Sequence, residues 1–310
     1  MTEPTTDEGV LAPEVAAWLE ANPMYGTPLE ELVPEILELA RGPVGAPPTR
    51  DIAHVHDDDV DGIPIRVYRN DGPPTGLVVY FHGGGFVIGS IGLMDNVARE
   101  LAHGSSAVVV SVGYRLAPEY PYPAGLDDCA AVTEWAFANA ARFDADPAAI
   151  AVAGESAGGN LAAAVSLRRR DAGAAPLAGQ VLMYPGVAAG QDFPSAVEFD
   201  GLVISRAAGR MYRQAYWGDR DVSRDPYAAP LGAETLAGLP PALVVLGGCD
   251  MLRDEGRAYA NRLAADGVAV EQECYAGQPH GFLNFGLPAS VPAFDRVGAW
   301  LRTRFADVRP

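Results

Sequence analysis

Five short apolar runs recur along the chain from residue 77 onward, and they determine the architecture that the sequence predicts. They are LVVYF (77–81), AVVVSVGY (107–114), AIAVAG (149–154), QVLMYP (180–185) and ALVVLGG (242–248). These runs lack the polar alternation of a strand with one wet face, so they predict strands that are buried on both sides. Helical patterns separate them at 124–143, from Ser156 to Arg170, and at 253–267. This alternation predicts an α/β fold with a mostly parallel central sheet that is flanked by helices.

Two parts of the chain do not follow this alternation of strands and helices. The first 48 residues contain short helical patterns at 13–22 and 28–40, and a connector rich in glycine and proline follows at 41–49. Residues 187–226 form a long, aromatic and irregular stretch between two predicted strands. We expect this stretch to be an insertion on the sheet and not part of it.

Composition and charge narrow the range of partners. The chain has 310 residues and a formal net charge of -18, and such an acidic surface repels phosphate backbones and anionic lipids. We therefore expect no nucleic-acid partner and no membrane partner. All 22 basic residues are arginine, which excludes Schiff-base chemistry, the lysine of a phosphate-binding loop and the Ser-x-x-Lys nucleophile pair.

The cysteines and the N-terminal sequence indicate a compartment. Cys129, Cys249 and Cys274 are few, odd in number and widely spaced, so a disulfide framework or a zinc site is not expected, and a reducing compartment fits. The first ten residues are acidic and polar, unlike a signal peptide. No apolar run approaches the length of a membrane span. The sequence therefore predicts a cytoplasmic protein.

The sequence GESAGG at 154–159 carries the first sign of catalytic chemistry. Its frame Gly154-x-Ser156-x-Gly158 lies between a predicted strand and a predicted helix and matches a nucleophile elbow. Glycine on both flanks lets neighbouring chain pass without a Cβ clash, and the following helix directs its N-terminus at the site. The competing interpretation is a glycine-rich helix start with a capping serine.

A reactive serine needs a base and an acid. His280 in GQPHGFLNF follows the last predicted strand, and Asp250 in GGCDMLRDEG follows the strand before it. The order Ser156, Asp250, His280 is that of a hydrolase triad in which the serine attacks, the histidine shuttles the proton and the aspartate orients the histidine. Asp254 and Glu255 are rival acids, although they also suit the start of a helix.

The glycine-rich sequence HGGGF at 82–86 follows the first buried strand and resembles an oxyanion loop. We expect oxyanion donors from two of Gly83, Gly84 and Gly85, together with Ala157, the residue after the candidate nucleophile. The sequence does not decide which two glycines donate. A phosphate-binding loop is the alternative, and it conflicts with the absence of lysine. His82 is expected to hold the loop in place and not to act as the base.

An acidic stretch at 54–64, HVHDDDVDGIP, resembles a metal-binding loop. Its aspartates match the start of an EF-hand loop, but Tyr68 stands where the twelfth position requires glutamate. We interpret this stretch as a solvated turn before the first strand, GIPIRVYRN at 62–70, and expect no metal site.

Taken together, these motifs resemble the hormone-sensitive-lipase-like family of carboxylesterases, the bacterial type IV group. HGGGF, YRLAPE, PAGLDD, GESAGG, CDMLRDEG and HGF occur in the family's order from about residue 76 to 286. The resemblance implies a single α/β-hydrolase domain over 1–310, in which segments of approximately 1–48 and 187–226 form a helical cap. It also implies hydrolysis of short-to-medium-chain acyl esters without a cofactor, by a monomer or homodimer. Glu155 departs from the family, which often has aspartate before the nucleophile.

Several alternatives stay open at this level. Relatives of the fold that lose catalytic residues serve as small-molecule receptors, but the base is retained here as His280. The same triad also serves amide hydrolysis, lactone opening and dehydration. Phe86, Tyr184, Phe193 and Trp217 are candidates for the wall of an apolar pocket, although such aromatic residues are more often core.

Overall fold

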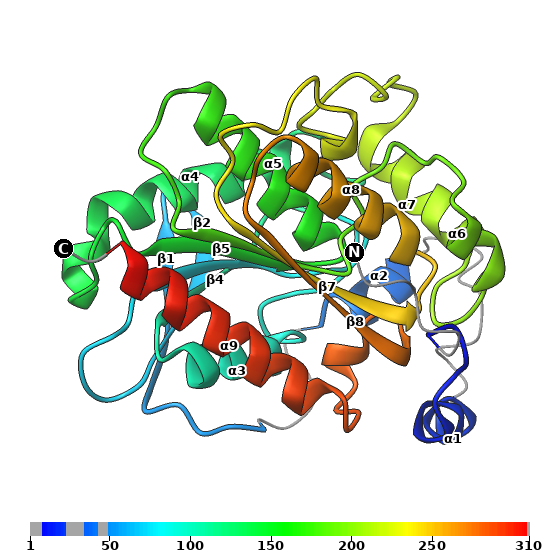
Figure 1. Cartoon of the computed structure of the whole chain (residues 1–310), viewed down its shortest axis with the longest axis horizontal. Helices are drawn as coiled ribbons and strands as arrows, with labels where there is room; N and C mark the ends of the chain where they lie inside the picture. The colour runs from blue at the N-terminus through cyan, green and yellow to red at the C-terminus, as the bar shows by residue number, and fades with distance from the viewer. Residues whose placement is uncertain (1–7, 23–33, 43–48, 309–310) are drawn as a thin grey trace.

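A single eight-stranded sheet forms the centre of the molecule (Figure 1). The computed structural model describes residues 8–22, 34–42 and 49–308. The strand order is β1-β2-β4-β3-β5-β6-β7-β8; the pairs β1–β2 and β2–β4 are antiparallel and all other neighbours are parallel. The strands are β1 (His54–Val60), β2 (Ile63–Arg69), β3 (Leu77–Phe81), β4 (Val108–Val112), β5 (Ile150–Glu155), β6 (Gly179–Met183), β7 (Ala242–Cys249) and β8 (Val270–Pro279).

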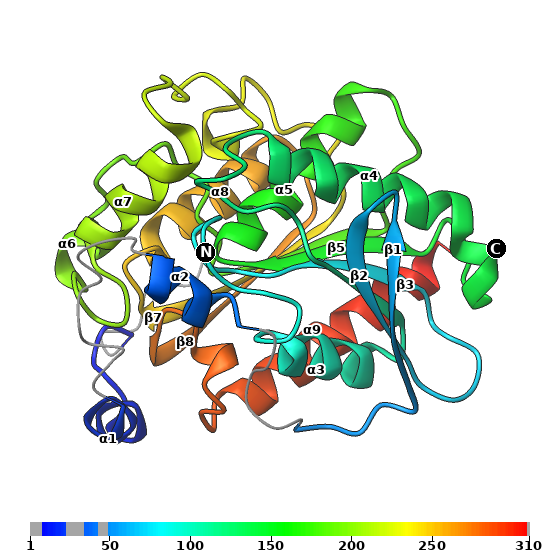
Figure 2. The ribbon, with the colours of Figure 1, turned by 180° about the vertical axis from the view of Figure 1, so that it is seen from behind.

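The five apolar runs of the sequence are strands β3 to β7, and every residue in them is buried. Helices α3 (Asp95–Ser105) and α9 (Ser290–Asp307) cover one face, and α4 (Ala124–Asn139), α5 (Ala157–Asp171) and α8 (Arg253–Ala265) cover the other (Figures 1 and 2). Side chains along β3 alternate between the two cores, since Val79 and Phe81 pack on the α5 side whereas Val78 and Tyr80 pack on the α9 side. The predicted α/β fold with a mostly parallel sheet is therefore confirmed.

Four further helices lie outside this sandwich: α1 (Pro13–Ala21), α2 (Pro34–Ala40), α6 (Pro194–Glu198) and α7 (Arg206–Trp217). Helices α6 and α7 lie at the end of the sheet toward which β7 and β8 point (Figure 1). Ser205 caps α7, because its side chain accepts a hydrogen bond from the Ala208 amide. Both helices fall within the stretch expected to form a cap. Most of the connector at 41–49 and the first part of the 28–40 pattern lie outside the described residues.

The prediction of a solvated turn at 54–64 is wrong for most of its length. Residues His54–Val60 form the edge strand β1, which pairs with β2, and the turn is confined to Asp61 and Gly62, both with positive φ. Nearly all side chains of β1 are exposed, so charged residues replace the apolar alternation by which a strand is recognised. Charged side chains are a common feature of edge strands.

The described residues also contain short 3₁₀ helices at Ala140–Phe143, Pro230–Gly232 and Phe282–Asn284. None of the described helices is both long and apolar enough to cross a membrane. All three cysteines are unpaired.

Candidate active site

Ser156 stands on the turn between β5 and α5, as the sequence predicts. Its backbone has φ 54° and ψ −117°, a conformation that L-residues rarely adopt. Its amide donates to the Met183 carbonyl at 2.9 Å, and its own carbonyl accepts from the Gly186 amide at 3.2 Å. The end of β6 and the chain just after it therefore fix the serine backbone from both sides.

The two glycines that flank Ser156 are required because a side chain at either position would clash with backbone atoms. A Cβ on Gly158 would lie 2.0 Å from the Phe81 carbonyl oxygen, and a Cβ on Gly154 would lie 2.0 Å from the carbonyl oxygen of Gly158. Neither contact is possible for a real side chain, because both neighbours are backbone atoms. The glycines thus allow β3, β5 and α5 to approach closely enough to hold Ser156 at the carboxyl end of β5.

The structure brings Ser156, His280 and Asp250 together in one hydrogen-bonded chain. His280 Nε2 lies 2.9 Å from Ser156 Oγ, and His280 Nδ1 lies 2.9 Å from Asp250 Oδ2. Asp250 follows β7 directly, and His280 follows β8, so both extend from the carboxyl ends of strands. The second oxygen of Asp250 accepts the Leu252 amide at 2.8 Å, which fixes the carboxylate. The arrangement suits proton transfer from the serine to the imidazole.

The electrostatics of the site favour a protonated imidazole more than solution does. Burial of His280 opposes its positive charge, but the neighbouring carboxylate of Asp250 outweighs burial, with smaller contributions from Glu155 and Glu255. The net effect raises the pKa of His280 above its ordinary value. A histidine that is a stronger base accepts the serine proton more readily.

The two rival acids have other partners. Asp254 accepts the Ser195 amide at 2.9 Å and forms an ion pair with Arg253. Glu255 accepts the amides of Val187 and Ala188, at 2.8 and 3.4 Å. Burial raises the pKa of Glu255 to about 7, although these two amides oppose the shift. Neither rival acid forms a hydrogen bond with His280.

The three glycines of the candidate oxyanion loop differ in whether their backbone amides are already hydrogen-bonded. Gly84 and Gly85 have φ of 119° and 60°, which favour glycine. The Gly83 amide donates to Glu155 Oε1 at 3.3 Å, whereas the amides of Gly84, Gly85 and Ala157 have no acceptor among the described residues. Gly83 is thus engaged elsewhere, and the other three amides are available to a ligand.

Glu155 is the residue whose role the sequence left undefined. Its buried carboxylate accepts four hydrogen bonds, two on each oxygen, from donors on three segments of the chain. Oε1 accepts from Tyr80 and Gly83, and Oε2 accepts from Tyr184 and Asn284. The sequence signal was a charged residue at the end of an apolar run, but its partners become visible only in the fold.

His82 occupies the position expected of a structural residue. It is buried, its Nδ1 lies 2.7 Å from the Gly83 carbonyl oxygen, and its ring stacks on Tyr114 with centroids 4.3 Å apart. Burial lowers the pKa of His82 to about 4, so the ring is neutral near pH 7. The Tyr114 hydroxyl also donates to the His82 carbonyl. These contacts support the start of the oxyanion loop.

The candidate pocket aromatics have different environments. Tyr184 lies edge-on to His280 with centroids 5.1 Å apart, and Phe86 stacks on Tyr216 at 4.0 Å. Trp217 lines a pocket on α7 and Phe193 is half-buried at the start of α6. Within the described part of the chain no group of three potential metal ligands comes together.

Comparison with known proteins places this geometry in a family. A family model described as alpha/beta hydrolase fold matches residues 78–284. Carboxylesterase NlhH of Mycobacterium tuberculosis is 39% identical over 317 residues, which cover 97% of this chain and 98% of that protein. An arylesterase of Saccharolobus solfataricus is 36% identical over 296 residues, with 89% and 90% of the two chains covered.

Solved structures agree with these relatives. The hyperthermophilic esterase of the archaeon Pyrobaculum calidifontis superimposes with a TM-score of 0.87 and 35% sequence identity. The alignment covers 97% of this chain and all of that one.

Proposed function

The chain belongs to the hormone-sensitive-lipase-like carboxylesterases of the α/β-hydrolase fold, and we propose that it cleaves short-to-medium-chain acyl esters through an acyl-enzyme intermediate. It is a carboxylic ester hydrolase. The observation that carries the mechanistic proposal is the unbroken chain of two 2.9 Å contacts from Ser156 through His280 to Asp250.

In the first half-reaction Ser156 Oγ attacks the ester carbonyl carbon while His280 Nε2 takes the hydroxyl proton. Asp250 holds the ring through Nδ1 and stabilises the imidazolium that forms. The tetrahedral oxyanion then collapses, the bond to the alcohol oxygen breaks, and His280 returns the proton to the leaving alcohol. An acyl group remains bonded to Ser156 Oγ.

The second half-reaction repeats these steps with water. His280 takes a proton from the water, whose oxygen attacks the acyl carbon, and the carboxylic acid leaves as Ser156 regains its proton. We assign the oxyanion donors to Gly84, Gly85 and Ala157, and not to Gly83, because the Gly83 amide is committed to Glu155.

The preference for smaller acyl groups rests on the cap. Helix α7 lies so close to the oxyanion loop that a Cβ on Gly85 would be 2.4 Å from the Tyr212 ring. An aromatic ring at this distance limits the space above the reacting carbonyl. We also propose a cytoplasmic location, which the three unpaired cysteines support.

Hydrolysis of nitrophenyl esters from acetate to palmitate, with wild type and Ser156→Ala side by side, tests the proposal. We expect turnover concentrated at the short chains and a loss of about 10⁴-fold or more in the variant, as for other triad nucleophiles. Circular dichroism shows that the variant is folded. Equal turnover by both proteins would exclude Ser156 as the nucleophile.

Absence of turnover with every ester would favour the receptor interpretation or a substrate that is not an ester. The same triad serves amidases and lactonases, so a parallel panel of anilides and lactones distinguishes these activities from the esterase.

A further inference from the structure

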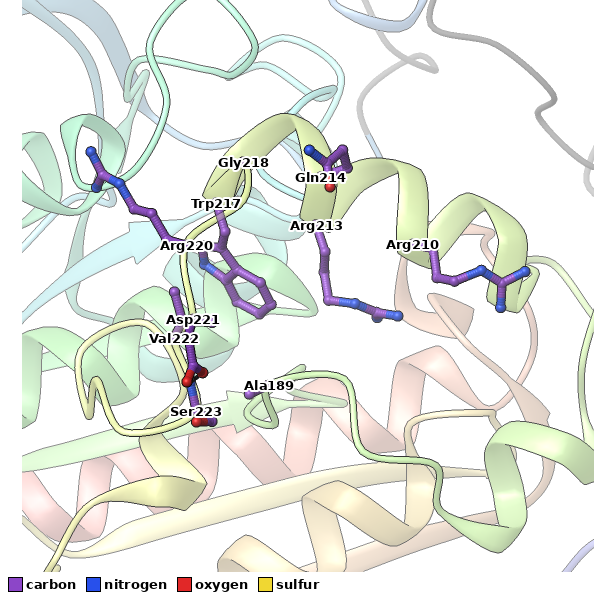
Figure 3. A pocket seen from close by; sticks show the side chains of 10 residues that line it. All are labelled: Ala189, Arg210, Arg213, Gln214, Trp217, Gly218, Arg220, Asp221, Val222 and Ser223. Atoms are coloured by element: carbon purple, nitrogen blue, oxygen red, sulfur yellow. Dashed lines mark hydrogen bonds between the residues drawn. The ribbon is translucent and has the colours of Figure 1, made fainter.

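Helix α7 has two faces with different environments. Tyr212 and Tyr216 on one face pack toward the oxyanion loop, against Gly85 and Phe86. The opposite face, with Arg210, Arg213, Gln214 and Trp217, borders a pocket of about 330 Å³ (Figure 3). Ala189 and residues 220–223 line the rest of this cap pocket. The Trp217 ring projects from the helix toward Ala189, and the Arg213 side chain leaves the same side of the helix before its guanidinium turns away from the ring (Figure 3).

Arg213 carries an unneutralised charge in this pocket. Its side chain is half-buried, and no described residue forms a hydrogen bond or an ion pair with its guanidinium. A Cβ on Gly190 would lie 3.1 Å from Arg213 Nε, so the guanidinium packs against a backbone that has no side chain. Taking a cation out of water without a partner is costly, and guanidinium groups in proteins are usually paired.

The charged groups around Arg213 do not supply the missing anionic partner. Burial, the largest cause, and the neighbouring Arg210 lower the pKa of Arg213, while Glu255 and Asp192 act in the opposite direction from beyond ion-pair distance. The Glu255 carboxylate is occupied by two backbone amides. Asp192 is paired with Arg206.

The remaining charged side chains of the cap pocket do not pair with Arg213. Arg220 donates to the Tyr122 carbonyl, and the exposed Asp221 accepts the Ser223 amide. Of the three arginines that line the pocket, Arg210 and Arg220 direct their guanidinium groups away from it (Figure 3), so Arg213 is the cation that a ligand in the pocket would meet. A guanidinium without an anionic partner attracts a small anion.

We propose that the cap pocket binds a carboxylate group, with the Arg213 guanidinium as its main partner and the Trp217 ring as the apolar wall beside it. The planar fork of a guanidinium matches a carboxylate with two parallel N–H···O bonds. The size of the pocket suits a small organic acid, since ligand pockets start at roughly 300 Å³. One carboxylate group, with its single negative charge, fits beside Arg213 better than a phosphate group with about two, because Asp221 stands on the pocket wall and repels added charge.

The cap pocket lies close to the candidate catalytic site. Gly186 donates to the Ser156 carbonyl, and Ala189 lines the pocket only three residues later, a span of at most about 11 Å. Helix α7 separates the pocket from Gly85. The carboxylate therefore belongs either to the far end of an acidic ester that is hydrolysed at Ser156 or to a separate small acid. The first source rests on the proposed esterase function, whereas the second does not.

The first experiment compares mono-(4-nitrophenyl) glutarate with the neutral 4-nitrophenyl pentanoate, which has the same chain length. We expect the ratio of kcat/KM for the acidic ester over the neutral ester to fall by about ten- to hundredfold in Arg213→Gln, the range for a hydrogen bond to a charged group. The change should lie mostly in KM. Arg213→Lys keeps the charge without the fork and is expected to give an intermediate ratio.

Arg224→Gln is the matched control. It removes the same charge from an exposed position in the cap region, outside the pocket lining, and is expected to leave the ratio unchanged. Thermal unfolding of each variant reports whether the cap is folded, and the lysine variant keeps the comparison valid where glutamine destabilises the protein.

The second experiment measures binding of free glutarate and of inorganic phosphate to Ser156→Ala by calorimetry, with and without Arg213→Gln. A ratio that falls in the ester assay assigns the carboxylate to the substrate. An unchanged ratio with Arg213-dependent binding of glutarate assigns it to a separate acid. Phosphate that binds more tightly than glutarate contradicts a carboxylate site, and no Arg213-dependent effect in either assay overturns the proposal.

Failure of the wild type to hydrolyse both esters would contradict the proposed function and not the cap pocket. Glutarate binding to the Ser156→Ala protein then still tests the pocket by itself.

Discussion

Glu155 Oε1 lies 3.3 Å from the amide nitrogen of Gly83, so the residue before the candidate nucleophile binds the first glycine of the oxyanion loop. The same carboxylate accepts hydrogen bonds from Tyr80, Tyr184 and Asn284. Asn284 lies four residues after His280, so one buried side chain connects the elbow, the oxyanion loop and the histidine loop. We infer that Glu155 sets the relative positions of these three parts.

Glu155→Gln tests this positioning role. An amide offers one acceptor oxygen where the carboxylate offers two, so two of the four donors lose their acceptor. We expect kcat to fall by about ten- to hundredfold, and the free energy of unfolding to fall by about 1–3 kcal/mol, as for a buried donor left unpaired. Glu155→Asp keeps the charge and should recover part of kcat. Unchanged kcat in Glu155→Gln would refute the role.

The pH dependence of kcat/KM should report His280. The imidazole must be neutral to accept the serine proton, and its raised pKa keeps it protonated to a higher pH than usual. Activity should therefore rise with pH through a midpoint above about 6.5, the ordinary value for histidine. In Glu155→Gln the midpoint should move down, because the Glu155 charge contributes to the raised pKa. A flat profile from pH 5 to 9 would exclude His280 as the base.

Two matched aspartate variants test the choice of acid. Asp250→Asn should lower kcat by about 10⁴-fold, because an amide favours the wrong histidine tautomer. Asp254→Asn should leave kcat within a fewfold of wild type, since Asp254 contacts Ser195 and Arg253 and not His280. The reverse pattern in steady-state kinetics would show that the assignment is wrong.

Glu255→Gln should change how stability depends on pH. The folded-state pKa of Glu255 is raised from 4.5 to about 7, so its stabilising effect is present below pH 4.5 and is lost as the pH rises to 7. Removing this titration should raise the free energy of unfolding at pH 8 by on the order of 3 kcal/mol, at about 1.4 kcal/mol per pKa unit, and by much less at pH 5.

Urea unfolding of wild type and Glu255→Gln at the two pH values measures this difference. The exposed Glu20→Gln is the control and should show none. Equal effects of Glu255→Gln at pH 5 and pH 8 would contradict the raised pKa.

Gly158→Ala should disrupt the elbow. The added Cβ meets the Phe81 carbonyl oxygen at 2.0 Å, so α5 or β3 must shift. We expect a loss of at least about 1–3 kcal/mol in unfolding free energy, typical of overpacking, together with a large fall in kcat. Gly186→Ala is the control, because its Cβ has its nearest neighbour at 3.6 Å. Equal stability of the two variants in urea would argue against the steric explanation.

Much of this architecture could be predicted from the sequence because buried parallel strands have a distinctive pattern. The runs that became β3 to β7 are almost entirely apolar and fully buried, and strand ends are where Ser156, Asp250 and His280 were expected. The exposed edge strand β1 escaped prediction, because its pairing with β2 depends on backbone hydrogen bonds and not on apolar side chains.

The finer details of the site depend on tertiary contacts that no local pattern encodes. The sequence does not distinguish the three glycines of HGGGF, and only the contact with Glu155 sets Gly83 apart. Asp250 and Asp254 are likewise both acids near the start of α8, and they differ only in which partner the fold gives them. Arg213 gave no sequence signal, because only the folded structure shows that no described residue pairs with it.

Hydrogen bonds to Met183, the last residue of β6, and to Gly186, just after it, fix the backbone of Ser156 on both sides. The position of the candidate nucleophile is thus set by the sheet, while the residues that we propose to contact the substrate lie on α7. Directed evolution of this protein can therefore randomise the pocket face of α7 and screen for new esters without rebuilding the reactive centre.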